Sequence, residues 1–139
     1  MNKVAEEIYQ TVLKMFELGK QGMSEEFDDL HSSEYTRYSD LPPYRLQERE
    51  EGLQLKMSLM TQLVDFEYSV ENFRVLTSGH LALAFFTLQY KGMAVNDYAF
   101  EGKFVKGLAR CTLVLEKVGG CWKILHEHLS RVPEGFSPD

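Results

Sequence analysis

The chain has 139 residues, of which 44% are hydrophobic and 26% are charged. This composition is typical of one folded domain with its own core, and it excludes a disordered chain. The net charge of −6 argues against nucleic acid as a partner. The longest apolar run, at residues 81–86, is too short to cross a membrane. Two cysteines do not make a disulfide framework, so we expect a reduced, cytoplasmic protein.

The first half of the chain is predicted to be mainly helical. Apolar side chains recur at helical spacing from Val4 to Leu18, and two glycines follow them. Ser24 is a typical helix N-cap because acidic residues fill the turn after it. A weakly alternating segment at 33–39 is consistent with a strand before the turn that begins at Asp40. The predicted helices span about residues 3–19, 24–31 and 47–62.

The second half is predicted to be a β-sheet. Residues 64–70 alternate between apolar and polar side chains, as expected for a strand with one buried face. The later segments 80–91, 98–116 and 121–130 are rich in branched and aromatic residues and are separated by glycine-containing turns. We therefore expect an α+β fold in which about three N-terminal helices pack on the concave face of a cone-shaped, curved and mostly antiparallel sheet. The sheet would cover about residues 64–131 of a single domain, 1–139.

The end of the chain resembles a known family. The segment ARCTLVLEKVGGCWKILHEHLS, residues 109–130, is similar to the last hairpin of SnoaL-like domains. The order of helices and strands resembles the wider superfamily of nuclear-transport-factor-2-like proteins, which includes ketosteroid isomerase. The association domain of the calmodulin-dependent kinases ends similarly. The resemblance implies a pocket between the helices and the concave face, and a partner subunit on the outer face. It does not select an activity, because the relatives include isomerases, cyclases, dehydratases, assembly hubs and binding modules.

Strand parity divides the motif His126-Glu127-His128. On a regular strand His126 and His128 share one face with Trp122 and Ile124, whereas Glu127 points to the opposite face. A catalytic triad built from all three motif residues is therefore excluded on such a strand.

The register of the last hairpin, around residues 117–121, has two alternatives. A three-residue loop at 118–120 is favoured by its two glycines and would pair Thr112 with His126 and Cys111 with Glu127. A two-residue loop is the alternative.

The resemblance and the strand parity together assign residues to the two faces of the sheet. Beside Glu127, the pocket wall would contain Phe86, Leu88, Tyr90, Cys111, Leu113, Leu125 and Leu129. The outer face would contain Phe85, Arg110, Thr112, Trp122, Ile124, His126 and His128. Because both faces are too apolar to lie in water, we expect a homodimer that covers the outer face.

Three residues are candidates for acid–base chemistry. A carboxylate at Glu127 among apolar neighbours would favour its neutral form and could act as a general acid or base. Alternatively, Glu127 is bound to Arg110 or to a cation on a helix. Asp40, shortly before two prolines, is similar in position to the base of ketosteroid isomerase, although a turn-forming aspartate is the alternative. The donor hydroxyl could come from any of four tyrosines, Tyr35, Tyr38, Tyr68 and Tyr90, and we take Tyr38, close to Asp40, as the catalytic candidate.

A metal site at His126 and His128 is chemically possible, because two histidines on one strand face can chelate zinc. The site would need His31, His80 or Glu116 as a third ligand, and no spacing in the sequence brings one of them close. We expect instead that both histidines pack at a subunit interface and that no metal is bound. No phosphate-binding or dinucleotide motif is present, so no cofactor is expected.

Two functions fit these features. The first is a binding module that holds a small hydrophobic molecule in an apolar pocket and dimerises through its sheet. The alternative is a cofactor-independent isomerase, cyclase or dehydratase that acts on a hydrophobic carbonyl compound with Asp40 or Glu127 as general base. The cavity discriminates between them. A packed interior between Phe86, Leu113 and Glu127 would exclude the enzyme, whereas an open pocket reached by a carboxylate and a tyrosine hydroxyl a few ångströms apart would favour it.

Overall fold

The computed structural model describes residues 1–96 and 101–136. The start of the predicted strand 98–116 and the last residues of the predicted domain lie outside these ranges. The elements follow in the order α1 (Lys3–Gln21), α2 (Ser24–Asp29), β1 (His31–Ser39), α3 (Arg49–Thr61), β2 (Leu63–Ser78), β3 (Leu81–Asn96), β4 (Glu101–Val118) and β5 (Cys121–Arg131).

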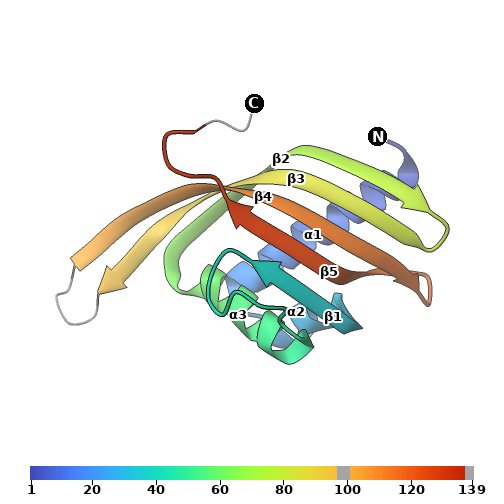
Figure 1. Cartoon of the computed structure of the whole chain (residues 1–139), viewed down its shortest axis with the longest axis horizontal. Coiled ribbons are helices and arrows are strands. Elements are labelled where there is room, and N and C mark those ends of the chain that lie inside the picture. Colours follow the sequence, from blue (N-terminus) through green and yellow to red (C-terminus); the bar gives the residue numbers. More distant parts are fainter. Residues whose placement is uncertain (97–100, 137–139) are drawn as a thin grey trace.

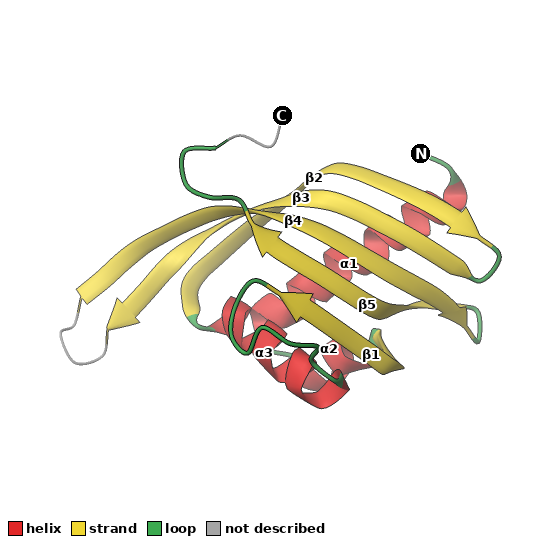
Figure 2. Cartoon of the chain, in the orientation of Figure 1, coloured by secondary structure: helices red, strands yellow, loops and turns green. Residues whose placement is uncertain are grey.

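The strands form one mixed sheet with the order β1-β5-β4-β3-β2. Strand β1 runs parallel to β5, and the other neighbours are antiparallel. The sheet curves, and all three described helices lie on one side of it (Figure 1). Figure 2 shows the same separation of helices and strands into two layers. The predicted α+β fold, with helices on the concave face of a curved sheet, is confirmed.

Helix α1 supplies most of the helical side of the core. The Asn2 side chain caps its start by accepting a hydrogen bond from the backbone N–H of Ala5 at 2.8 Å. Gly22 ends it in the left-handed conformation, with φ of 70°. Between these caps Ile8 and Val12 are fully buried against the sheet, as the spacing of apolar residues predicted. No helix in the described part of the chain is long and apolar enough to span a membrane.

The last hairpin differs from the predicted register. Its loop contains two residues, Gly119 and Gly120, with φ of 59° and 82°, and Val118 pairs with Cys121. The three-residue loop was therefore wrong. Both loop residues need a positive φ, which glycine adopts without a steric penalty.

A β-bulge in β5 changes which residues share a face. Leu115 pairs with Ile124, but the preceding residue of β4, Val114, pairs with His126, so Leu125 is an extra residue. The bulge shifts the alternation by one position. Trp122 and Ile124 consequently lie in the buried core, with exposed fractions of 7% and 0%. Their predicted place on the outer face, with His126 and His128, was wrong.

Candidate functional site

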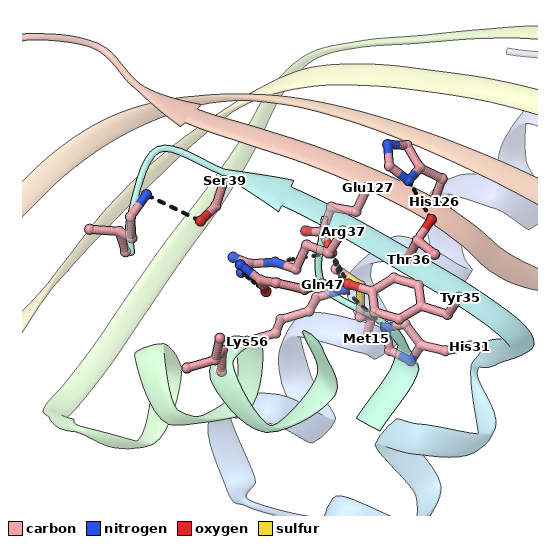
Figure 3. A network of polar contacts seen from close by, with 12 residues as sticks. Met15, His31, Tyr35, Thr36, Arg37, Ser39, Gln47, Lys56, His126 and Glu127 are labelled. Carbon is pink, nitrogen blue, oxygen red and sulfur yellow. Dashed lines mark hydrogen bonds and ion pairs between the residues drawn. The ribbon is translucent and has the colours of Figure 1, made fainter. Parts of the chain in front are cut away.

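Two strands and one helix bring a group of charged and polar side chains together inside the molecule. Tyr35 and Arg37 point inward from β1, Lys56 comes from α3, and Glu127 comes from β5 beyond the bulge (Figure 3). Parallel pairing of β1 with β5 places Arg37 opposite Glu127. We call these four residues, together with His31, the buried charge cluster.

Glu127 lies at the centre of this cluster and is 2% exposed. Its Oε1 accepts a hydrogen bond from the Tyr35 hydroxyl at 2.7 Å and lies 2.7 Å from Lys56 Nζ. Burial alone would raise the pKa of Glu127, but the charges of Lys56 and Arg37 and the two hydrogen bonds outweigh it and lower this pKa to about 2. The carboxylate is therefore ionised at neutral pH, in contrast to the neutral form expected from its apolar neighbours. Arg110 and a cation on a helix were the two expected ion-pair partners of Glu127. The observed partner is Lys56 on α3, whereas Arg110 donates to Ser130 at 3.1 Å.

The Lys56 ammonium group is enclosed by groups that accept hydrogen bonds from it. Its Nζ lies 3.0 Å from His31 Nε2 and 2.7 Å from Met15 Sδ, in addition to the Glu127 contact. Burial lowers the pKa of Lys56, and the Glu127 charge opposes that shift. His31 Nδ1 lies 2.8 Å from the Phe27 carbonyl, so Nδ1 donates there and Nε2 accepts from Lys56. Burial, followed by the charge of Lys56, lowers the pKa of His31 well below its ordinary value, so this imidazole is neutral.

Arg37 is 2% exposed and is incompletely paired. Its Nη1 donates to Gln47 Oε1 at 3.1 Å, and the two backbones exchange hydrogen bonds of 3.0 and 2.9 Å. Its Nε lies 3.9 Å from Glu127 Oε1, which is too long for a hydrogen bond, and it is buried without another partner. A buried guanidinium donor without an acceptor is rare in folded proteins.

An apolar cavity of about 230 Å³ adjoins the buried charge cluster. Arg37, Lys56 and Glu127 line it, and so does Arg131, whose side chain is 49% exposed. The rest of the wall is formed by Gln62 and by the apolar and aromatic side chains of Phe16, Leu41, Leu59, Met60, Leu63, Phe66, Leu88, Tyr90, Val105, Ala109 and Leu129. A polar group at the edge of a mostly apolar cavity is the usual composition of a small-molecule site.

The structure brings some of the predicted pocket residues to this cavity and not others. Glu127, Leu88, Tyr90 and Leu129 line it. Gly107 makes room for Tyr90, because a Cβ at that position would clash with the phenol ring and hydroxyl. The remaining predicted residues lie elsewhere, in the packed core or at the bulge: Phe86, Cys111, Leu113 and Leu125.

The predicted catalytic residues are not brought together. Asp40 accepts hydrogen bonds from the backbone N–H of Arg131 at 2.9 Å and from its Nε at 3.1 Å, outside the cavity lining. Tyr38 is 44% exposed on the outer face, where its ring lies 5.7 Å from His126 and 5.9 Å from His128. Asp40 therefore forms an ion pair at the end of β1, and the Tyr38 hydroxyl does not reach Glu127.

The motif histidines lie on the outer face of the sheet, as predicted. His126 Nδ1 lies 2.8 Å from the Thr36 hydroxyl, and burial lowers its pKa. Of the proposed third metal ligands, His31 is occupied by Lys56 and Glu116 accepts from Ser32 at 2.6 Å. In residues 1–96 and 101–136 no three histidine, cysteine, aspartate or glutamate side chains are grouped closely enough to hold a metal ion.

Three residues of the site were not predicted from the sequence: Arg37, Gln47 and Lys56. Tyr35 was one of four tyrosines expected as possible donors, and nothing in the sequence selected it. One signal for Lys56 was available, because it follows Leu53 by three positions on the apolar stripe of α3. A lysine on a buried stripe needs a carboxylate partner inside the protein. The weak alternation of β1 contained no comparable signal for Arg37.

Solved structures with the same fold come from several functional classes. A dehydratase candidate of the nuclear-transport-factor-2-like family from Streptomyces avermitilis is 18% identical, with a TM-score of 0.77 and coverage of 92% of this chain and 96% of that one. The hub homology domain of the calmodulin-dependent kinase II from Chlamydomonas reinhardtii is 20% identical, with a TM-score of 0.75 and coverage of 94% and 100%. A ketosteroid isomerase-like protein from Erwinia carotovora atroseptica is 15% identical, with a TM-score of 0.70 and coverage of 96% and 99%.

These structures establish the fold and not the activity, because the identities are low. No functionally curated protein matches the sequence. The model of the SnoaL-like domain matches residues 8–134, which is most of the chain. The match agrees with the curved sheet and with the helices on its concave face, and the chain belongs to the SnoaL-like domain family.

Proposed function

We propose that this domain binds a small hydrophobic molecule in the apolar cavity beside the buried charge cluster. The observation that supports the proposal most strongly is the cavity itself, about 230 Å³ of space with a mainly apolar wall. Small molecules bind in concave, mostly apolar sites of this kind, so a pocket of this size suggests an occupant. It exceeds the roughly 150 Å³ that admits benzene and is smaller than the roughly 300–1,000 Å³ of drug-sized sites. A molecule with one ring and a short chain fits this range.

The state of Glu127 favours binding over catalysis. A general base works best when its pKa is near the working pH. The pKa of Glu127 is lowered to about 2, and its Oε1 is held by the Lys56 ammonium and the Tyr35 hydroxyl. Asp40, the other candidate base, is paired with Arg131. The fold also occurs in proteins described as dehydratase-like and isomerase-like, but this arrangement of carboxylates supports a binding role.

A thermal-shift and calorimetric screen with neutral one-ring compounds tests the proposal. Val105→Trp at the cavity wall should fill part of the space and abolish binding. Val95→Trp is the matched control, because Val95 lies on the same hairpin, is 51% exposed and does not line the cavity. The proposal fails if no compound binds the folded wild type, or if Val105→Trp binds as well as the control.

We also propose that the outer face of the sheet forms a homodimer. Tyr38, Thr112 and His128 are exposed there, and Phe85 and Val114 are half-buried. Tyr38, Phe85 and Val114 make this face partly apolar, and apolar sheet faces are normally covered by another layer. Two structural relatives are described as a hub and as an association domain, which supports self-association of this chain as well.

A further inference from the structure

The buried charge cluster contains more positive than negative charge. Arg37 and Lys56 are two cations, and Glu127 is the only carboxylate within ion-pair distance of either among the described residues. Their other neighbours carry no charge. His31 is neutral, and burial raises the pKa of Tyr35 and of Cys111, so that both keep their protons. An uncompensated charge inside a protein is costly unless something pairs with it.

The unpaired part of this cluster is Arg37. Lys56 takes the short contact with Glu127 at 2.7 Å, whereas Arg37 Nε is 3.9 Å away. The Nε atom is buried without a hydrogen-bond acceptor, and Gln47, its neighbour on the other side, is uncharged. At the cavity mouth Arg131 is already neutralised by Asp40 at 3.1 Å. The surplus positive charge therefore lies on Arg37, at the wall of the cavity.

We propose that the ligand of this cavity is a small amphipathic carboxylate whose anionic group pairs with Arg37 while its apolar part fills the space between Phe66, Leu88 and Leu129. This inference rests on the proposed function and adds the chemical class of the ligand. A carboxylate in the cavity would balance the charge of Arg37 by pairing with the part of the guanidinium that lines the wall. The volume of about 230 Å³ suits one ring with a short acid chain.

The direct test compares two ligands of the same shape on the wild-type protein. Titration calorimetry with 3-phenylpropionate and with the neutral 3-phenylpropanamide at pH 7 separates charge from apolar burial. We expect the acid to bind more tightly by about tenfold or more, because a hydrogen bond to a charged group contributes about 1.5–3 kcal/mol. Equal binding of acid and amide would overturn the carboxylate inference and leave the proposed function standing. Binding of neither to the folded protein would overturn both.

Arg37→Gln tests the residue that carries the inference. The substitution leaves Lys56 and Glu127 as a pair of opposite charges, so no buried charge loses its counter-ion. We expect the affinity for the acid to fall to that for the amide, and Arg37→Lys to retain part of the preference. Arg45→Gln removes the same charge from an exposed surface pair and should leave both affinities unchanged. An undiminished preference for the acid in Arg37→Gln would assign the anion to another cation. If Arg37→Gln does not fold, the comparison on the wild type still decides.

Discussion

Glu127 shows how the surroundings of one residue determine its chemistry. A carboxylate among apolar side chains is expected to be protonated, but Lys56, Arg37 and Tyr35 reverse that expectation. Removing the carboxylate charge would leave two buried cations without a counter-ion. Because breaking a buried ion pair by removing one partner is strongly destabilising, Glu127→Gln should lower the free energy of unfolding by about 3 kcal/mol or more.

Urea unfolding at pH 7 measures the effect of Glu127→Gln. Glu51→Gln is the control, because it removes a carboxylate from an exposed pair with Arg45 and should change stability little. If both variants were equally stable, Glu127 would not be the counter-ion of the cluster.

His31 predicts a pH dependence of stability near neutral pH. Its pKa is lowered well below 6.5 in the folded protein, so below that pH the unfolded chain binds a proton that the folded chain does not. Stability therefore falls as the pH decreases from about 6.5, by up to about 1.4 kcal/mol per pH unit. Urea unfolding between pH 7 and 5 should show this slope in the wild type and a smaller slope in His31→Gln. His80→Gln is the control and should keep the wild-type slope, because His80 is exposed. An unchanged slope in His31→Gln would contradict a neutral, buried His31.

Glu127 contributes a separate loss of stability in acid. Its folded pKa is depressed to about 2, so the stability from its ion pairs is present above its ordinary pKa of 4.5 and is lost as the pH falls between these values. The two residues therefore act in different pH ranges.

At the scale of elements, the turn between β4 and β5 depends on two glycines with positive φ. No neighbouring atom lies within 4 Å of a Cβ built at Gly120, so a substitution there tests the backbone conformation alone. Gly120→Ala should destabilise the protein by about 1 kcal/mol, and Gly120→Asn by less, because asparagine tolerates the left-handed region better. Thermal or urea unfolding of both variants checks the order, and a stable alanine variant would contradict a two-residue turn.

The elements also show how far the sequence could predict the structure. Helical spacing and strand alternation predicted three helices and the sheet, and the family resemblance added the inward position of Glu127. The bulge at Leu125 was not predictable, because it appears only in the pairing of β4 with β5. It moved Trp122 and Ile124 from the expected outer face into the core. Arg37 and Lys56 approach Glu127 only after β1, α3 and β5 come together. The charge cluster therefore cannot be predicted from a local sequence pattern.

For the whole molecule, the proposed homodimer makes a prediction about size in solution. Analytical ultracentrifugation at micromolar concentration should give twice the mass of the 16.1 kDa chain. Thr112→Arg introduces a charge on the outer face and should shift the equilibrium toward monomer, because an unpaired charge is costly in an interface. Thr77→Arg, on the edge strand β2, is the control and should remain dimeric. A wild-type monomer would contradict this interface.

The proposed ligand of the cavity is a small amphipathic carboxylate that pairs with Arg37. A crystal structure of the protein with saturating 3-phenylpropionate tests it most directly. We expect the phenyl ring in the cavity between Phe66 and Leu88, with the carboxylate within hydrogen-bond distance of the Arg37 guanidinium. A cavity closed by side chains, or a ligand whose carboxylate points away from Arg37, would contradict it.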